Sequence, residues 1–325
     1  MIFFHSIRKK FEAIFDTEEN AFRKAQVLAP VFYYILVFFS FQQLEGLKFQ
    51  VAHPHTLTTL TWPLFWAQHM DFAATVTVVL LFFVISSLVG AFYSVHRLAR
   101  IAAFLGMLFF HAYTNASGVN HQYDVWLWVS FLLLFLPGGW GFYKYRSDNN
   151  SFRKKFLLVF WSVQGYVLLT YTMSGIGKFI GSFEQLQRGG ATLLSPDSAS
   201  LTVASQLLQM QQDSVLGTFI LTHPILAWIG FLVIFYVQIT AFSVAFRPAL
   251  HRLWALFLIL FHLATYLAMN AIFVAPTLLL TVFFFDSPFA DREISVKNQL
   301  KAFPLFGTLF VRVMRGRATK HTSRP

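Results

Sequence analysis

The stretch FAATVTVVLLFFVISSLVGAFY, residues 72–93, has no charged side chain over 22 positions. At 1.5 Å per residue, a helix of this length crosses the roughly 30 Å hydrocarbon core of a bilayer. Its apolar residues follow one another continuously instead of alternating, which favours a helix over a strand of a membrane barrel. A helix also satisfies its own backbone hydrogen bonds in lipid. We therefore predict a transmembrane helix over 72–93.

The rest of the chain has the same apolar character. Of its 325 residues, 56% are hydrophobic and 12% are charged, about half the charged fraction of a soluble domain. The absence of cysteine excludes disulfides and thiolate metal sites. We predict an all-α integral membrane protein with about eight transmembrane helices. The predicted spans are 27–44, 72–93, 101–116, 124–141, 157–177, 218–245, 253–271 and 273–285.

The positive charges are divided unequally between the two sides of these spans. One set of connecting segments, which includes both termini, holds 22 basic residues, and the other set holds three, Lys48, Lys178 and Arg188. The positive-inside rule places the basic set, and hence both termini, in the cytoplasm. The net charge of +11 is then a topology signal and an attraction to anionic lipid. We expect the lipid bilayer as a partner and no nucleic acid.

The domain organisation follows from these spans. Residues 1–26 are predicted to be an amphipathic cytoplasmic segment at the membrane interface, because apolar residues recur at helical spacing. Residues 27–285 form the transmembrane domain, and 286–325 form a basic cytoplasmic tail. The outward segment 178–217 includes a polar and apolar stretch over 199–216 that suits a helix on the outer surface.

Ionisable groups near the hydrocarbon are costly, so they are candidate functional residues. Lys178 is the strongest of these candidates, because it stands at the outer end of the fifth span beside Gly175 and Gly177. These glycines would let another helix or a ligand approach closely. The alternative is a lysine that extends its amine to the interface. His111, Asp124 and His223 are further ionisable residues close to the hydrocarbon.

Two histidines could likewise have either a structural or a functional role. His121, preceded by Asn120, lies at the outer entrance to the fourth span, where it can bind water or assist chemistry. His262 lies mid-span, where a neutral ring could cap a carbonyl of a neighbouring helix or act in a site. Asn270, near the outer end of the same span, could donate a hydrogen bond there. His53 and His55 lack a third ligand at suitable spacing, so we predict no metal site.

Three stretches together resemble a known family. They are NASGVNHQYDVWLWVSFLLL (115–134), YTMSGIGKFIGSF (171–183) and LFLILFHLATYLAMNAIFVAPTLLL (256–280). In order and spacing they are similar to the HTTM (horizontally transferred transmembrane) domain. This domain is the membrane part of vitamin K-dependent gamma-carboxylases and their bacterial relatives. The resemblance covers most of residues 10–290.

The resemblance implies a chemistry for the candidate residues. Lys178 matches the base that deprotonates the vitamin K hydroquinone, and His121 and His262 match two assisting histidines. The deprotonated quinol reacts with oxygen to produce a strong base, which removes a carbon-bound proton before carbon dioxide adds. The implied cofactor is a reduced quinone, menaquinol or vitamin K hydroquinone, with oxygen and carbon dioxide as co-substrates. The residues expected around the cofactor are Asn120, Tyr171, Gly175, Gly177 and Asn270.

The chain also departs from the family pattern. Gly177 precedes the base where a second lysine is common, Phe183 replaces a tryptophan, and Gln238 lies where a glutamate is often found. The short basic tail replaces a large soluble domain that holds the protein substrate. Two hypotheses lead, and a transporter is a weaker third because the sequence shows no inverted repeat and no broken mid-membrane helix flanked by charges. The chain is a gamma-carboxylase-like enzyme of a bacterial-type inner (plasma) membrane, with its site facing the periplasm or exterior. Alternatively, it is a non-catalytic membrane subunit that binds a quinone or lipid, or helps to process a partner peptide.

Overall fold

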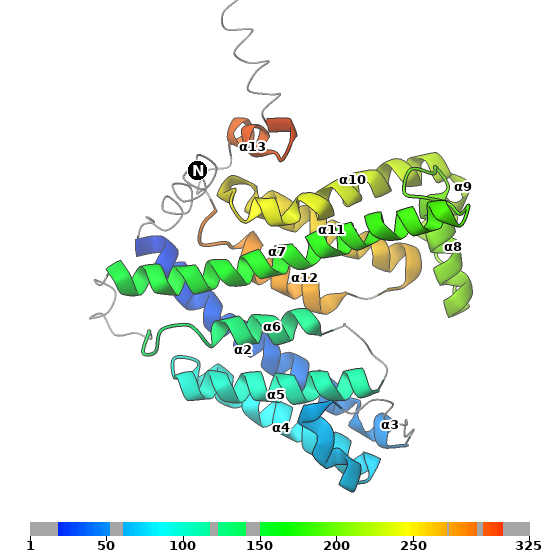
Figure 1. The fold of residues 1–325 in the computed structure, drawn as a ribbon. Helices are drawn as coiled ribbons and strands as arrows, with labels where there is room; N and C mark the ends of the chain where they lie inside the picture. The colour runs from blue at the N-terminus through cyan, green and yellow to red at the C-terminus, as the bar shows by residue number, and fades with distance from the viewer. Residues whose placement is uncertain are drawn as a thin grey trace, which may run out of the picture. The chain divides into compact units, whose positions relative to one another are not determined.

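The computed structural model describes residues 19–52, 61–117, 123–140, 150–271, 273–290 and 295–307, and all regular structure within them is helical (Figure 1). Contacts divide the chain into two compact units, Met1–Tyr166 and Val167–Pro325. The boundary falls inside one long helix, α7 (Asn150–Gln187). Most of the predicted amphipathic segment 1–26 lies outside the described residues.

The first unit packs around aromatic side chains. Its elements before α7 are α2 (Glu19–Glu45), α3 (Leu47–Ala52), η1 (Trp62–His69), α4 (Phe72–Tyr93), α5 (Arg97–Ala116) and α6 (Asp124–Leu133). Phe83 of α4 stacks on Phe110 of α5 with ring centroids 4.6 Å apart. Phe39 of α2 contacts both rings and stacks on Trp126 of α6. Interlocked rings from four helices thus form the core of this unit.

The second unit holds the remainder of α7 and the later helices. These are α8 (Ser198–Met210), α9 (Val215–Thr222), α10 (Pro224–Val244), η3 (Pro248–Leu250), α11 (His251–Met269), α12 (Val274–Leu280), the π-helical turn η4 (Thr281–Phe285) and α13 (Val296–Ala302). Trp254 of α11 is fully buried and donates its indole N–H to the Val237 carbonyl at 3.0 Å. His251 bridges the Val244 carbonyl and the Ser287 hydroxyl. These buried bonds join α10, α11 and the segment after η4.

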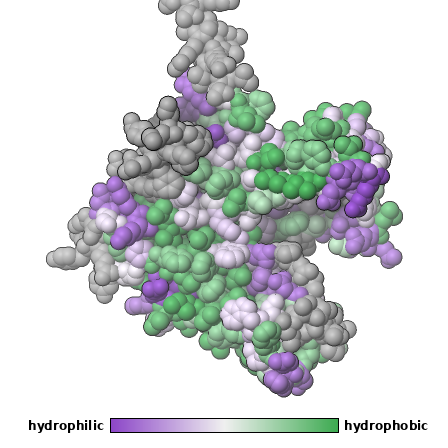
Figure 2. Space-filling model, viewed as in Figure 1, coloured by the Kyte–Doolittle hydropathy of each residue, from purple (hydrophilic) through white to green (hydrophobic). Residues whose placement is uncertain are grey.

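Several helices are long and apolar enough to cross a membrane. Among the described residues they are Glu19–Ala52, Phe72–Tyr93, Asn150–Gln187, Pro224–Val244 and Pro248–Met269. Hydrophobic side chains also gather on the surface of α10 (Figure 2), where Ile225, Leu226, Ile229 and Val233 are each more than half exposed. Such a surface suits lipid and not water. The predicted class, a multi-pass all-α membrane protein, is thereby confirmed.

Two predicted spans differ from the observed helices. The span 218–245 is interrupted at His223, because α9 ends at Thr222 and α10 begins at Pro224. Proline lacks an N–H and has a fixed φ, so it suits the first position of a new helix. The span 124–141 is helical only to Leu133, and the helix-breaking sequence Pro-Gly-Gly follows at 137–139. The predicted helix within 199–216 is confirmed as α8, although it ends earlier, at Met210.

Candidate functional site

Lys178 lines a pocket of about 600 Å³ in the second unit. On α7 the lining residues Lys178, Gly181, Ser182 and Gln185 follow helical i, i+3, i+4, i+7 spacing, and α8 supplies the facing wall. The segment 191–193 closes one side, held by a Leu193 N–H bond to the Ser182 hydroxyl at 2.9 Å. Among the described lining residues there is no aspartate or glutamate.

The amine of Lys178 is held by a neutral partner. Its Nζ donates a hydrogen bond to the amide oxygen of Gln238 on α10. The same Nζ lies 5.4 Å from the ring centroid of Phe261 on α11, within the range of a cation–π contact. Lys178 is therefore turned toward α10 and α11 and is only partly exposed. This placement differs from that of an interface lysine extended into water.

Gln238 is itself positioned by α7. The side chain of Gln238 is almost fully buried. The backbone carbonyl of Gln238 accepts a hydrogen bond from the Thr172 hydroxyl at 3.2 Å. The Phe242 N–H donates to that hydroxyl at 2.9 Å. In a regular helix the Gln238 carbonyl and the Phe242 N–H would bond to each other. The Thr172 hydroxyl bonds both groups and so links α7 to α10 at this turn. The sequence marked Gln238 only as a departure from the family pattern and did not predict its bond to Lys178. One signal was present, because Gln238 is the only amide side chain in the largely apolar helix α10.

His262 and Tyr171 form a second buried pair close by. The Tyr171 hydroxyl and His262 Nε2 lie 2.7 Å apart and share a hydrogen bond. The imidazole is 7% exposed and contacts the rings of Phe261 and Phe273 at centroid distances of 5.1 Å. Its partner is thus a tyrosine hydroxyl and not a backbone carbonyl, which was one of the two alternatives for this residue. The other nitrogen, Nδ1, has no hydrogen-bond partner within the described residues.

The two predicted glycines have different surroundings. A Cβ added to Gly175 would lie 3.0 Å from the backbone nitrogen of Ile239 and 3.2 Å from its Cα, so α7 and α10 approach closely at this point. A Cβ on Gly177 would have no described atom within 4 Å. Gly175 therefore allows close helix packing, and the predicted cofactor roles of both Gly175 and Gly177 stay predictions.

Replacing these glycines with alanine should separate the two roles. Gly175→Ala should destabilise the protein by about 1–3 kcal/mol, because the added methyl group meets the α10 backbone. Gly177→Ala makes the same change at an open position in the same helix, and should be neutral or stabilising by up to about 1 kcal/mol. Thermal unfolding of the purified variants measures both effects. Equal losses from the two variants would show that close packing at Gly175 is unimportant.

Three predicted site residues remain, Asn270, Asn120 and His121. Asn270 ends α11 in the left-handed region, with φ of 53°, and its N–H bonds to the Tyr266 carbonyl. Asparagine tolerates this conformation better than most residues, which accounts for it without a cofactor. Asn120 and His121 lie outside the described residues. Their predicted roles, and the binding role of Asn270, stay predictions.

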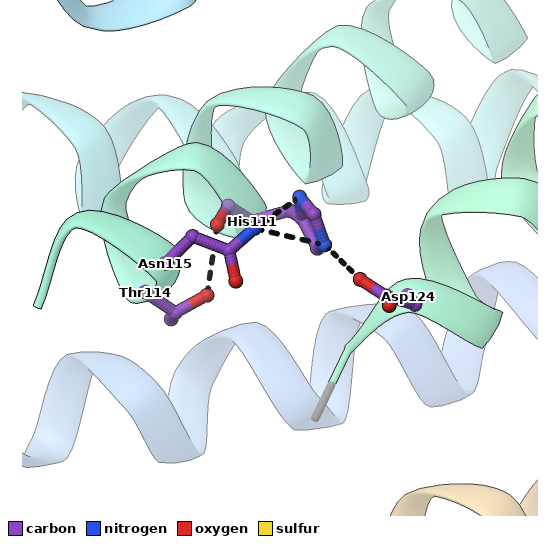
Figure 3. A network of polar contacts seen from close by, with 4 residues as sticks. All are labelled: His111, Thr114, Asn115 and Asp124. Atoms are coloured by element: carbon purple, nitrogen blue, oxygen red, sulfur yellow. Dashed lines mark hydrogen bonds and ion pairs between the residues drawn. The ribbon is translucent and has the colours of Figure 1, made fainter. Parts of the chain in front are cut away.

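A separate polar network occurs in the first unit (Figure 3). His111 of α5 pairs through Nε2 with the Asp124 carboxylate, which stands at the start of α6. The Asn115 amide approaches the imidazole at 3.4 Å, and the Thr114 hydroxyl donates to the His111 carbonyl at 2.9 Å. The Asp124 carboxylate, in the first turn of α6, complements the dipole at that helix's N-terminus. The network therefore joins α5 to α6.

Comparison with known proteins adds no assignment. No family model matches the chain, and neither the curated proteins nor the solved structures contain a match. Among the described residues, the geometry around Lys178 is therefore the only structural basis for a functional proposal.

Proposed function

We propose that the chain is an HTTM-type membrane protein with eight spans and both termini in the cytoplasm. We further propose that it is a gamma-carboxylase-like enzyme, in which Lys178 acts as a base toward a quinol at a site facing the periplasm or exterior. One observation supports this proposal above the others. The Lys178 amine is fixed by the neutral amide of Gln238 at the edge of a pocket whose described lining lacks a carboxylate.

A lysine with this environment is suited to general-base chemistry. An ion pair would hold the amine in its charged form, whereas an amide oxygen orients the amine without adding a negative charge. The free amine has the lone pair that a base requires. Nζ can then receive a proton from a phenol-like hydroxyl, while Gln238 retains the position of the side chain. Thr172 helps to hold Gln238 in place, because its hydroxyl donates a hydrogen bond to the Gln238 backbone carbonyl.

The residues beside Lys178 fit the chemical character of a quinol. Phe261 provides an aromatic face next to Nζ, and the unpartnered Nδ1 of His262 provides a buried hydrogen-bonding atom. Tyr171 fixes the orientation of that imidazole through Nε2. When bound, a quinol would supply the reducing equivalents for reaction with oxygen. The surrounding apolar helices would limit the access of water to the base.

The proposal is tested by measuring oxygen consumption with a reduced naphthoquinol. Wild-type protein in lipid nanodiscs should consume oxygen and form quinone epoxide, as measured with an oxygen electrode and by mass spectrometry. The Lys178→Ala variant should do neither above the rate of quinol alone. Wild-type protein that is inert with several quinols would reject the enzyme and favour the non-catalytic subunit. A partner that co-purifies in a fixed ratio would then be the expected finding.

A further inference from the structure

The pocket beside Lys178 has an unusual lining on its α8 side. Five residues of α8 face the pocket at helical spacing, and four of them have hydroxyl or amide side chains: Ser198, Thr202, Ser205 and Gln206, with Leu201 as the fifth. The facing α7 wall adds Ser182 and Gln185. A helix lying on a membrane surface would normally direct its polar face to water. Here that face lines the pocket, and Thr202 and Ser205 on it remain exposed.

Many of these groups lack partners. The side chains of Gln185, Ser205 and Gln206 are partly or fully exposed and make no hydrogen bond within the described residues, whereas the Ser198 hydroxyl oxygen is buried without a partner. Buried polar groups in folded proteins are normally paired, and leaving one unpaired costs about 1–3 kcal/mol. The buried Ser198 hydroxyl carries this cost, and the more exposed Gln185, Ser205 and Gln206 side chains beside it can also bond a ligand in the pocket.

The charge of the lining restricts the ligand. Lys178 is the one charged residue among the described lining residues, and the proposed chemistry requires its free amine. An ionised carboxylate or phosphate would need a cation to offset its desolvation, and the described lining has no second cation. The ligand portion in this pocket should therefore be uncharged.

The secondary structure of the walls restricts it further. Both walls are α-helices whose backbone groups bond within the helix, so they offer no edge for an added peptide strand. An amphipathic peptide helix needs an apolar groove, whereas most lining residues on these two helices have hydroxyl, amide or amine side chains. Recognition must use the side-chain hydroxyls and amides, each of which can both donate and accept. Phe231 and Leu193 add small apolar contacts.

We infer that this pocket binds an uncharged, hydroxyl-rich group, namely a saccharide or polyol. Its vicinal hydroxyls match side chains that donate and accept, and its C–H faces match Phe231. This assignment makes a saccharide or polyol the substrate class of the Lys178 site, and it therefore rests on the function proposed above. The group can come from a free sugar or from the head group of a glycolipid. A volume of about 600 Å³ is within the range of small-molecule sites.

Equilibrium binding to the full chain in nanodiscs, prepared without glycoside detergents, tests this inference. The probes are tritiated hexyl β-glucoside, maltose and an N-acetyl dipeptide amide. We expect hexyl glucoside to bind, and Gln206→Leu to raise its Kd about tenfold or more, equivalent to one lost hydrogen-bonding site. Gln209→Leu is the matched control, because Gln209 lies on α8 outside the pocket lining. It should change Kd by less than about twofold.

The outcomes separate the sources and the alternatives. Maltose that binds as tightly as hexyl glucoside identifies a free sugar, whereas binding of hexyl glucoside alone identifies a lipid-linked one. Binding of the peptide amide alone, binding of no probe, or equal effects of the two glutamine variants would overturn the inference. If Gln206→Leu does not fold, Gln185→Leu on the opposite wall should give the same loss. The assay contains no quinol, so absent oxygen consumption with intact sugar binding would reject the proposed enzyme alone.

Discussion

The Lys178→Ala variant is expected to lose quinol-dependent oxygen consumption by a factor of about 10²–10⁴, the usual contribution of a positioned general base. The loss should appear in kcat, because the amine acts on the proton during the reaction and contributes less to binding. Truncation leaves the Gln238 amide oxygen without its observed donor. It also leaves space next to Phe261 where the amine was. The measurement is the steady-state rate in nanodiscs at saturating quinol.

Chemical rescue distinguishes a base from a merely structural lysine. Added methylamine or ethylamine should restore part of the rate of Lys178→Ala, and the restored rate should rise with the concentration of free amine. Lys48→Ala is the matched control, since Lys48 is an exposed lysine of α3 and its replacement removes the same charge. That variant should retain wild-type turnover. A rate that no amine restores, in a variant that folds normally, would argue against Lys178 as the base.

The class of the fold could be predicted from the sequence, because hydrophobicity acts over whole segments. The uncharged stretch 72–93 has the same limits as α4, since Asp71 caps the helix through a bond to the Ala74 N–H. Interruptions inside apolar stretches were harder to foresee. Hydropathy alone did not separate α9 from α10 at His223, because the helix break depends on backbone geometry at Pro224 while the residues on both sides remain apolar.

The candidate site could be predicted only in part. Lys178 and His262 stand out in a sequence because ionisable groups are rare among apolar ones. Their partners do not, since Gln238 lies 60 positions beyond Lys178, and Tyr171 lies 91 positions before His262. Sequence spacing contains no information on contacts between distant helices. For the same reason the packing of Gly175 against α10 could not be distinguished from the open position of Gly177.

Arg100 illustrates a further limit of counting residues. The positive-inside argument treats it, with Arg97, as a charge in a cytoplasmic loop. In the structure its side chain is fully buried in the first turn of α5. Nη1 donates to the carbonyls of Ser94 and Val95 at 2.8 and 3.1 Å, and Nη2 donates to the Leu136 carbonyl. These carbonyls follow the C-terminal ends of α4 and α6, where helices leave backbone acceptors unpaired.

We therefore expect Arg100→Met to destabilise the protein by about 3–5 kcal/mol, because it removes buried hydrogen bonds from a charged donor, each of which contributes about 1.5–3 kcal/mol. The methionine fills much of the space but leaves the Ser94 and Leu136 carbonyls without the Arg100 donor, while the Val95 carbonyl keeps its bond from the Gly139 N–H. Arg97→Met removes the same charge from an exposed position three residues earlier, and should cost less than about 0.5 kcal/mol. Thermal and denaturant unfolding of both variants in one detergent provides the comparison. Similar losses would mean that net charge near the membrane matters more than the bonds of Arg100, whereas a loss confined to Arg100→Met would show that its guanidinium joins the ends of α4 and α6.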